Sequence, residues 1–179
     1  SPTAFYVGVT NLETGEGEYP RVTDLFKQMD WLRASASMPY VSRIVTLDGK
    51  PCLDGGIADS VPLAAFERMG YARNVVVLTK EEGFQRKSDN IPLLNFRYRK
   101  YPRFLATLAR RVELCDEEER YIQRAAAEGR AFVVRPSRKP EIGRLERDPE
   151  RLKSLYNLGR QDALAALPAM KRFLGAEGG

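Results

Sequence analysis

Histidine is the most informative absence from this sequence of 179 residues, because it does not occur at all. The imidazole is the commonest general base at neutral pH and the commonest metal ligand. Its absence excludes a Ser-His-Asp or Cys-His arrangement built within these residues. Any acid–base chemistry carried out by this chain must therefore use Asp, Glu, Lys, Tyr or Cys.

Cysteine is nearly absent as well. The two cysteines, Cys52 and Cys115, lie far apart and form no C-x-x-C pair, so a zinc site or a redox pair has little support. A low cysteine count is typical of a reducing compartment. No apolar run approaches the length of about 18 residues that a membrane span requires, and no charged-then-apolar signal opens the sequence. The expected location is the cytoplasm, and peripheral contact with a membrane stays open.

The hydrophobic content of the sequence and the pattern of its apolar runs predict one α/β domain. The sequence is 43% hydrophobic, which supplies a core for one domain of this length. The net charge of +5 favours anionic partners such as phospholipid, nucleic acid or acidic small molecules, although solubility alone also explains it. Apolar and β-branched runs alternate with amphipathic stretches, and the patterns predict strands at 4–10, 41–46, 51–54, 74–79 and 131–134 and helices at 23–36, 62–69, 102–112, 116–129 and 149–174. Pro168 is expected to break or restart the last of these helices.

The apolar run 74–79 is typical of a strand buried on both faces, as in a parallel sheet. With the strand at 51–54 and the helix at 62–69 it predicts a β-α-β unit. Ligands of such sheets bind beyond the C-terminal ends of the strands. Asp54 and the segment after Thr79 are therefore expected at one edge.

The candidate site is Leu53-Asp54-Gly55-Gly56. Asp48-Gly49 predicts a tight hairpin turn whose second strand ends at Asp54. The glycines that follow let the backbone turn sharply and remove side-chain bulk beside the carboxylate. Asp-Gly-Gly is also a common turn sequence, so an ordinary turn is the alternative interpretation.

A basic aromatic segment is a second candidate. No acidic residue occurs from 90 to 112, and the basic residues Arg97, Arg99, Lys100 and Arg103 alternate with aromatic ones. This mixture could bind an anionic lipid surface or nucleic acid. The alternative is an amphipathic helix that buries Phe104, Leu105, Leu108 and Val112 and keeps its arginines in water.

Several motifs occur together in a characteristic order. They are the strand and turn at 5–17, Ala34-Ser35-Ala36-Ser37-Met38-Pro39, the run 53–62 around Asp54, the strand at 75–79 and Tyr156-x-x-Gly159. In this order they resemble the C-terminal half of bacterial patatin-like phospholipases, over about residues 3 to 174. The serines of the small-residue run have no nucleophile elbow around them, and packing is their better interpretation.

The resemblance implies a partial patatin-like sheet with flanking helices, related to the α/β-hydrolases. It implies a Ser-Asp dyad that cleaves lipid acyl esters without a metal or cofactor. Asp54 matches the aspartate of that dyad and would accept the serine proton, which agrees with a sequence that holds no histidine. Gly55 and Gly56 would permit its close approach to the serine.

The sequence departs from the family pattern in one respect, because it has neither G-x-S-x-G nor a glycine-rich oxyanion loop. We therefore expect residues 1–179 to be the C-terminal portion of a single patatin-like domain whose nucleophile-bearing portion is absent. Such a fragment would be inactive alone and could self-associate through an uncovered apolar face. The alternative function is a non-catalytic module that uses Arg97, Arg99, Lys100 and Arg103 on anionic lipid or nucleic acid. The hydrolase interpretation involves no nucleic acid.

Overall fold

The structure is a computed structural model that describes residues 3–39, 41–86, 92–143 and 146–175. It combines helices with small β-sheets, which confirms the expected α/β class. The chain divides into two compact units. The first comprises Ser1–Pro62 and Arg86–Glu119, and the second comprises Leu63–Gln85 and Arg120–Gly179.

The first unit is built on a four-stranded antiparallel sheet in the order β3-β2-β6-β5. Its strands are β2 (Val9–Asn11), β3 (Gly17–Glu18), β5 (Val45–Leu47) and β6 (Lys50–Asp54). A separate antiparallel pair joins β1 (Phe5–Tyr6) to β4 (Arg21–Val22). The helices are α1 (Met29–Ser35), the 3-10 turn η1 (Gly55–Ile57), α3 (Pro92–Arg97), α4 (Pro102–Ala109) and the start of α5 (Arg111–Ala127).

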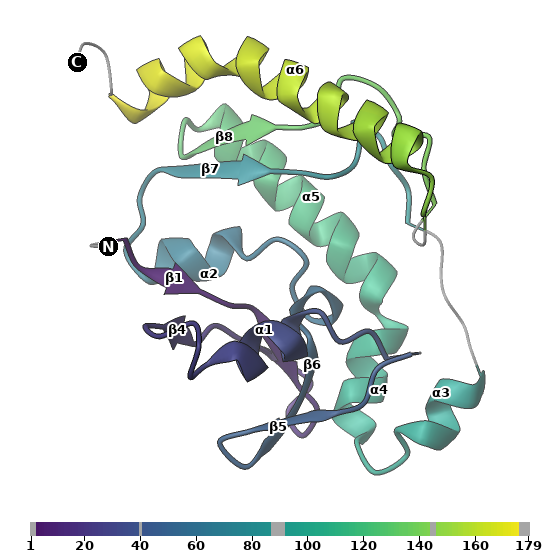
Figure 1. Ribbon diagram of the computed structural model, residues 1–179. Coiled ribbons are helices and arrows are strands. Elements are labelled where there is room, and N and C mark those ends of the chain that lie inside the picture. The colour runs from purple at the N-terminus through teal and green to yellow at the C-terminus, as the bar shows by residue number, and fades with distance from the viewer. Residues whose placement is uncertain (1–2, 40, 87–91, 144–145, 176–179) are drawn as a thin grey trace. The chain divides into compact units, whose positions relative to one another are not determined.

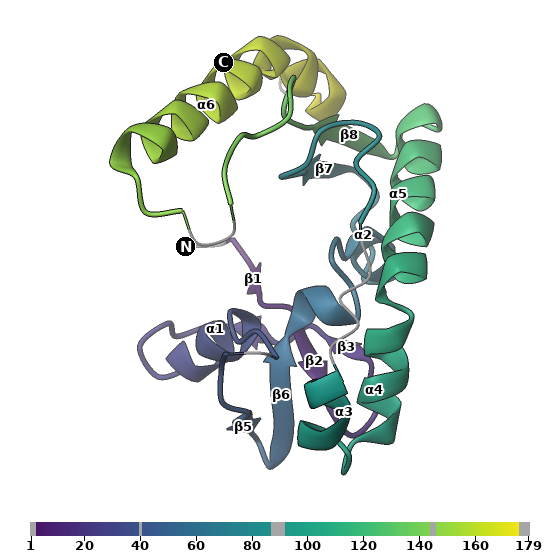
Figure 2. The same cartoon turned by 90° about the vertical axis from the view of Figure 1, so that its right-hand side faces the viewer.

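Side-chain alternation along β6 produces a core on each face of this sheet. Cys52 belongs to a buried cluster with Ala34 of α1, whereas its neighbour Leu53 belongs to a second cluster with Tyr98 and Phe104. Successive residues of a strand point to opposite faces. Helix α1 therefore covers one face, and α3 and α4 cover the other (Figure 2).

The hairpin β5–β6 forms as the sequence predicts. Leu47 pairs with Lys50, and the two residues between them, Asp48 and Gly49, have φ of 49° and 80°. Positive φ at both central positions is the requirement of a type I′ turn, which Asp-Gly satisfies well. This hairpin places Asp54 at the far end of β6.

The second unit contains a two-stranded parallel sheet. Its elements are α2 (Leu63–Arg68), β7 (Asn74–Val77), β8 (Ala131–Val134) and α6 (Pro149–Leu174). Strands β7 and β8 pair directly, and α6 packs on β8 (Figure 1). The ring centroids of Phe132 and Phe173 are 5.8 Å apart across this contact.

The predicted β-α-β unit of residues 51–79 is wrong. Strand β6 is paired with β2 on one edge and with β5 on the other, so neither edge remains for β7. Strand β7 instead takes β8 as its parallel partner. Burial on both faces is also wrong, because Val76 is buried while Val77 is 70% exposed.

Two helix starts and one helix break differ from the sequence prediction. Helix α1 begins at Met29 and not at the predicted residue 23, because the Asp24 carboxylate accepts the N–H groups of Phe26 and Lys27 and forms a separate turn. Helix α5 begins five residues before Asp116, at Arg111. Helix α6 continues through Pro168 and ends at Leu174, where Gly175, with a φ of 71°, caps it.

Candidate functional site

Asp54 is held at the end of β6 by hydrogen bonds from two sides. Its backbone N–H donates to the carbonyl of Ser37 over 3.0 Å. Its own carbonyl accepts the hydroxyl of Thr10 over 2.8 Å. Thr10 is fully buried, and its Oγ1 also accepts the N–H of Ala58 over 3.3 Å. These bonds fix the backbone from which the carboxylate projects.

The Asp54 carboxylate is fixed through one of its two oxygens. Oδ1 accepts the backbone N–H of Gly56 over 2.8 Å, and this bond caps η1. No other hydrogen bond to the carboxylate comes from the residues that the structure describes. The side chain is half-buried. Oδ2 can therefore accept a proton from a group that approaches from outside these residues.

The two glycines have different tasks. A Cβ at Gly55 would lie 2.5 Å from the backbone carbonyl of Gly8, so this position must stay bare for η1 to pack against the chain before β2. A Cβ at Gly56 would meet only Asp54 Oδ1, at 3.3 Å. The expected removal of bulk beside the carboxylate therefore applies to Gly56, while Gly55 serves the packing of the turn.

The small-residue run packs the end of α1 against the sheet. Ala34 is fully buried, and the hydroxyl of Ser37 donates to the carbonyl of Arg33 over 2.7 Å. The packing interpretation of this run is thus confirmed for Ala34 and Ser37. The carbonyl of Ser37 also supports Asp54, which links the two motifs physically.

Polar side chains from α5 reach the turn that follows Asp54. Arg111 Nη2 donates to the carbonyl of Gly56 over 3.1 Å. Glu118 Oε1 accepts the backbone N–H of Ser60 over 2.8 Å. The hydroxyl of Ser60 donates to the same Gly56 carbonyl over 3.0 Å and lies 3.4 Å from Cys115 Sγ.

Glu118 is the titratable group of this region with the clearest perturbation. Burial, and to a smaller extent the neighbouring Asp59 carboxylate, raise its pKa from the ordinary 4.5 to about 7. The N–H of Ser60 and the charge of Arg86 oppose that rise. Asp59 also accepts a hydrogen bond from the hydroxyl of Tyr19. A protonated Glu118 can share its proton with Asp59 near neutral pH.

Cys52 is not a candidate nucleophile. It is fully buried, and burial raises the pKa of its thiol to about 11. The thiolate is the nucleophilic form, so this cysteine is unreactive at neutral pH. Within the described ranges, no group of acidic or cysteine side chains is arranged to hold a metal ion.

The basic aromatic segment divides into a core face and a solvent face. Phe104 is fully buried, and Leu105 and Leu108 pack against the same cluster, which confirms the predicted core face for these residues. The four basic residues are all exposed: Arg97, Arg99, Lys100 and Arg103. Arg97 donates to the carbonyl of Ser42 over 2.7 Å. Phe96 is 69% exposed, with the Arg99 guanidinium 4.7 Å from its ring centroid.

Three residues around Asp54 were not indicated by the sequence. Thr10 sits in the first predicted strand, but nothing in its pattern marks a hydroxyl aimed at another strand. Arg111 and Glu118 lie about sixty residues further along the chain than Asp54. Their helical spacing is visible in the sequence, whereas their partners are set by the packing of α5 on the turn.

Two family models match different segments of the chain. Residues 7–67 match the model of patatin-like phospholipases, and residues 101–175 match the model of a domain of unknown function (DUF6363). No curated protein matched the sequence. The first match contains Asp54 and both of its glycines, so the patatin-like resemblance is supported over residues 7–67. The expected extension of that likeness to residue 174, and the assignment to the C-terminal portion of the family domain, gain no support from it.

No helix within the described ranges is both long and apolar enough to cross a membrane.

Proposed function

We propose that Asp54 is the general base of a Ser-Asp dyad that hydrolyses lipid acyl esters, and that its serine comes from outside residues 1–179. The observation that supports this proposal most is the geometry of the Asp54 carboxylate within the patatin-like segment. Oδ1 is anchored by Gly56 N–H, and Oδ2 receives no hydrogen bond from the described residues. One oxygen fixes the orientation and the other can take the proton.

In this mechanism the serine hydroxyl donates its proton to Asp54 Oδ2 as its oxygen attacks the ester carbonyl. Asp54 then returns the proton to the leaving alcohol, and an acyl-serine forms. A water molecule, deprotonated by the same carboxylate, releases the acid. A direct carboxylate base is consistent with the lack of histidine in the sequence. The backbone bonds to Ser37 and Thr10 would hold the base within hydrogen-bond reach of the serine.

The test is Asp54→Asn in the full-length protein that carries the serine. We expect kcat for a short acyl ester to fall by about 10²- to 10⁴-fold, which is the usual contribution of a positioned general base. The matched control is Asp48→Asn, an aspartate of the same hairpin whose φ of 49° asparagine tolerates well. Retention of wild-type kcat by Asp54→Asn would reject the dyad.

The isolated chain gives a second test of the same proposal. Residues 1–179 supply the base without a nucleophile elbow, so the purified chain should not hydrolyse an acyl ester. Robust hydrolysis by this chain would show that its own residues suffice and that the serine is not external. The cytoplasmic location expected from the low cysteine count stays a prediction.

The exposed basic aromatic segment supports a second, compatible role in contact with an anionic lipid surface. Phe96 is a large apolar side chain in solvent, and four exposed cationic groups lie within seven residues of it. Those groups are Arg97, Arg99, Lys100 and Arg103. Cationic groups beside an exposed aromatic ring are typical of peripheral membrane contact. Nucleic acid is the less favoured partner, because the structure presents one exposed ring here instead of a row of them.

A further inference from the structure

We propose that the first half of α5 is a positioning element that clamps the turn following Asp54. Arg111 and Glu118 would hold this turn from two points. The inference rests on the proposed function of Asp54, and it assigns a task to residues that lie outside the patatin-like segment.

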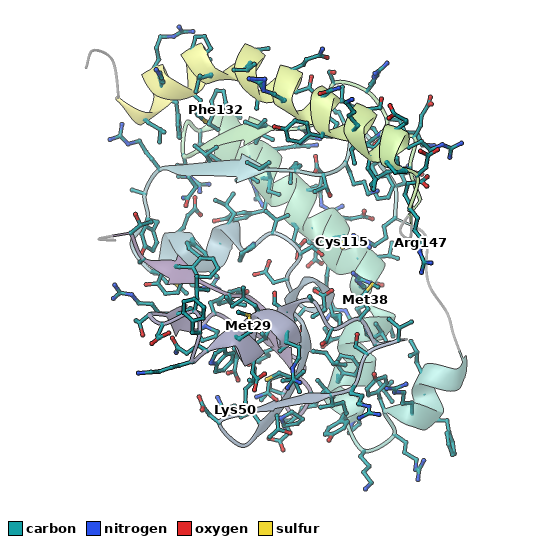
Figure 3. All side chains as sticks on the ribbon, viewed as in Figure 1. Met29, Met38, Lys50, Cys115, Phe132 and Arg147 are labelled. Carbon is teal, nitrogen blue, oxygen red and sulfur yellow. The ribbon has the colours of Figure 1, made fainter. Side chains whose placement is uncertain are left out.

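The clamp comes from one stripe of the helix. Arg111, Cys115 and Glu118 are spaced by four and three residues, so they lie on the same face of α5. All three contact the segment 56–60. Figure 3 labels Cys115 on α5, the middle member of the stripe. Residues 56–60 and 111–119 belong to the same compact unit.

The contacts converge on the residue that anchors the base. The carbonyl of Gly56 accepts two donors, Arg111 Nη2 and Ser60 Oγ. The N–H of the same glycine donates to Asp54 Oδ1. A displacement of Gly56 would therefore move the hydrogen-bond donor that orients the carboxylate. Misplacing a catalytic group by about 1 Å can lower a rate by about 10²-fold.

Glu118 fixes the other end of the turn. It accepts the N–H of Ser60, and its carboxyl also faces Asp59 from the turn and Arg86 from the segment before α3. A protonated Glu118 can donate to Asp59 while it accepts from Ser60. Ionised Glu118 would instead repel Asp59, because two carboxylates would share a half-buried site. Glu118→Gln is uncharged at every pH, and its amide can donate to Asp59 and accept from Ser60 as the protonated carboxyl does.

The clamp also connects the two segments that match different families. Asp54 and Gly56 belong to the patatin-like segment 7–67, whereas Arg111 and Glu118 belong to the segment 101–175. The segment that matches the domain of unknown function would then help to position the hydrolase base through the first half of α5. A purely structural helix would stabilise the fold without affecting Asp54 selectively.

The test is amide hydrogen exchange at residues 56–60, compared in wild-type chain 1–179 and in Glu118 variants. Glu118→Ala removes the acceptor of the Ser60 N–H, so we expect exchange at Ser60 to accelerate at least 10-fold. Glu118→Gln keeps an acceptor and should retain wild-type exchange at pH 6. The control is Glu117→Ala, an exposed neighbour on the same helix, which should change nothing. Should Glu118→Ala fail to fold, Arg111→Gln tests the other point of the clamp.

The same variants in the full-length protein separate positioning from stability. We expect Glu118→Ala to lower kcat by about 10- to 100-fold with little change in KM, and Glu118→Gln to restore it. Unchanged exchange in Glu118→Ala overturns the clamp, and so does faster exchange with wild-type kcat. Failure of the proposed function has a different signature, which is wild-type activity in Asp54→Asn whatever the exchange rates are.

Discussion

Gly55 packs against the backbone of Gly8, and a Cβ on Gly55 would lie 2.5 Å from both the carbon and the oxygen of the Gly8 carbonyl. The contact is asymmetric, because a Cβ on Gly8 would meet only the ring of Tyr19, at 4.0 Å. One glycine of the pair is therefore obligatory, and the other can be substituted.

The first prediction concerns this pair. Gly55→Ala forces a backbone shift in a closely packed turn and should lower the free energy of unfolding by about 1–3 kcal/mol. Gly8→Ala, the matched control, should change it by less than about 1 kcal/mol. Urea denaturation followed by the fluorescence of Trp31 measures both, because this single tryptophan lies in α1 of the same unit. Equal stabilities of the two variants would contradict the contact.

The second prediction is a pH dependence of stability that originates at Glu118. Its pKa is about 7 in the folded state and near its ordinary value of 4.5 in the unfolded chain. The folded state therefore binds this proton more tightly. The contribution of Glu118 to the free energy of unfolding is therefore fully present below pH 4.5 and is lost as pH rises through about 7. Because the sequence has no histidine, few other side chains titrate in this window.

The size of that effect follows from the shift in pKa. For a fully buried carboxyl with this shift, the free energy of unfolding would fall by about 3 kcal/mol as pH rises. Solvent screening of the half-buried Glu118 reduces this fall to about 1–2 kcal/mol. Unfolding of the isolated chain, measured at pH 5 and pH 8 through Trp31, should show this decrease in wild type. Glu118→Gln should remove it, and Glu117→Gln should leave it in place. A decrease that persists in Glu118→Gln would assign the titration to another group.

The third prediction concerns the basic aromatic segment. Vesicles that contain anionic phospholipid should bind the chain, and affinity should fall as salt is raised because the attraction is largely electrostatic. Replacing Arg99 and Lys100 by glutamine removes two cationic groups at about 1 kcal/mol each, which lowers affinity by about 30-fold. Phe96→Ala should weaken binding without altering its salt dependence.

The matched control for vesicle binding removes the same amount of charge elsewhere. Lys139 and Lys153 are exposed lysines outside the segment, and replacing both by glutamine should leave binding nearly unchanged. Equal losses in the two double variants would mean that net charge alone attracts the vesicles. Binding to neutral and anionic vesicles with equal affinity would reject the electrostatic contact.

Local features of the site could be predicted because they depend on a few adjacent residues. Asp48-Gly49 predicts a type I′ turn since both positions tolerate positive φ, and the register of this hairpin places Asp54 at the end of β6. The two glycines then predict a sharp turn, which the structure forms as η1. Phe104, Leu105 and Leu108 follow helical spacing and are found on the core side of α4.

The arrangement of strands could not be predicted in the same way. The apolar run 74–77 has the composition of a buried parallel strand, and it does pair in parallel, but with β8 and not with β6. The choice of partner depends on which strand edges are already occupied. Both edges of β6 are taken by strands that precede it, β2 and β5. This pairing cannot be predicted from the composition of the strands.

By itself the sequence determined the absence of a histidine-based site, the hairpin that presents Asp54 and the glycines that turn the chain after it. Tertiary structure decided which groups support that carboxylate. Thr10, Ser37, Arg111 and Glu118 reach the turn from segments distant in the chain. Turn geometry is set by the φ preferences of neighbouring residues, whereas a hydrogen bond between distant segments exists only once packing brings donor and acceptor within about 3 Å.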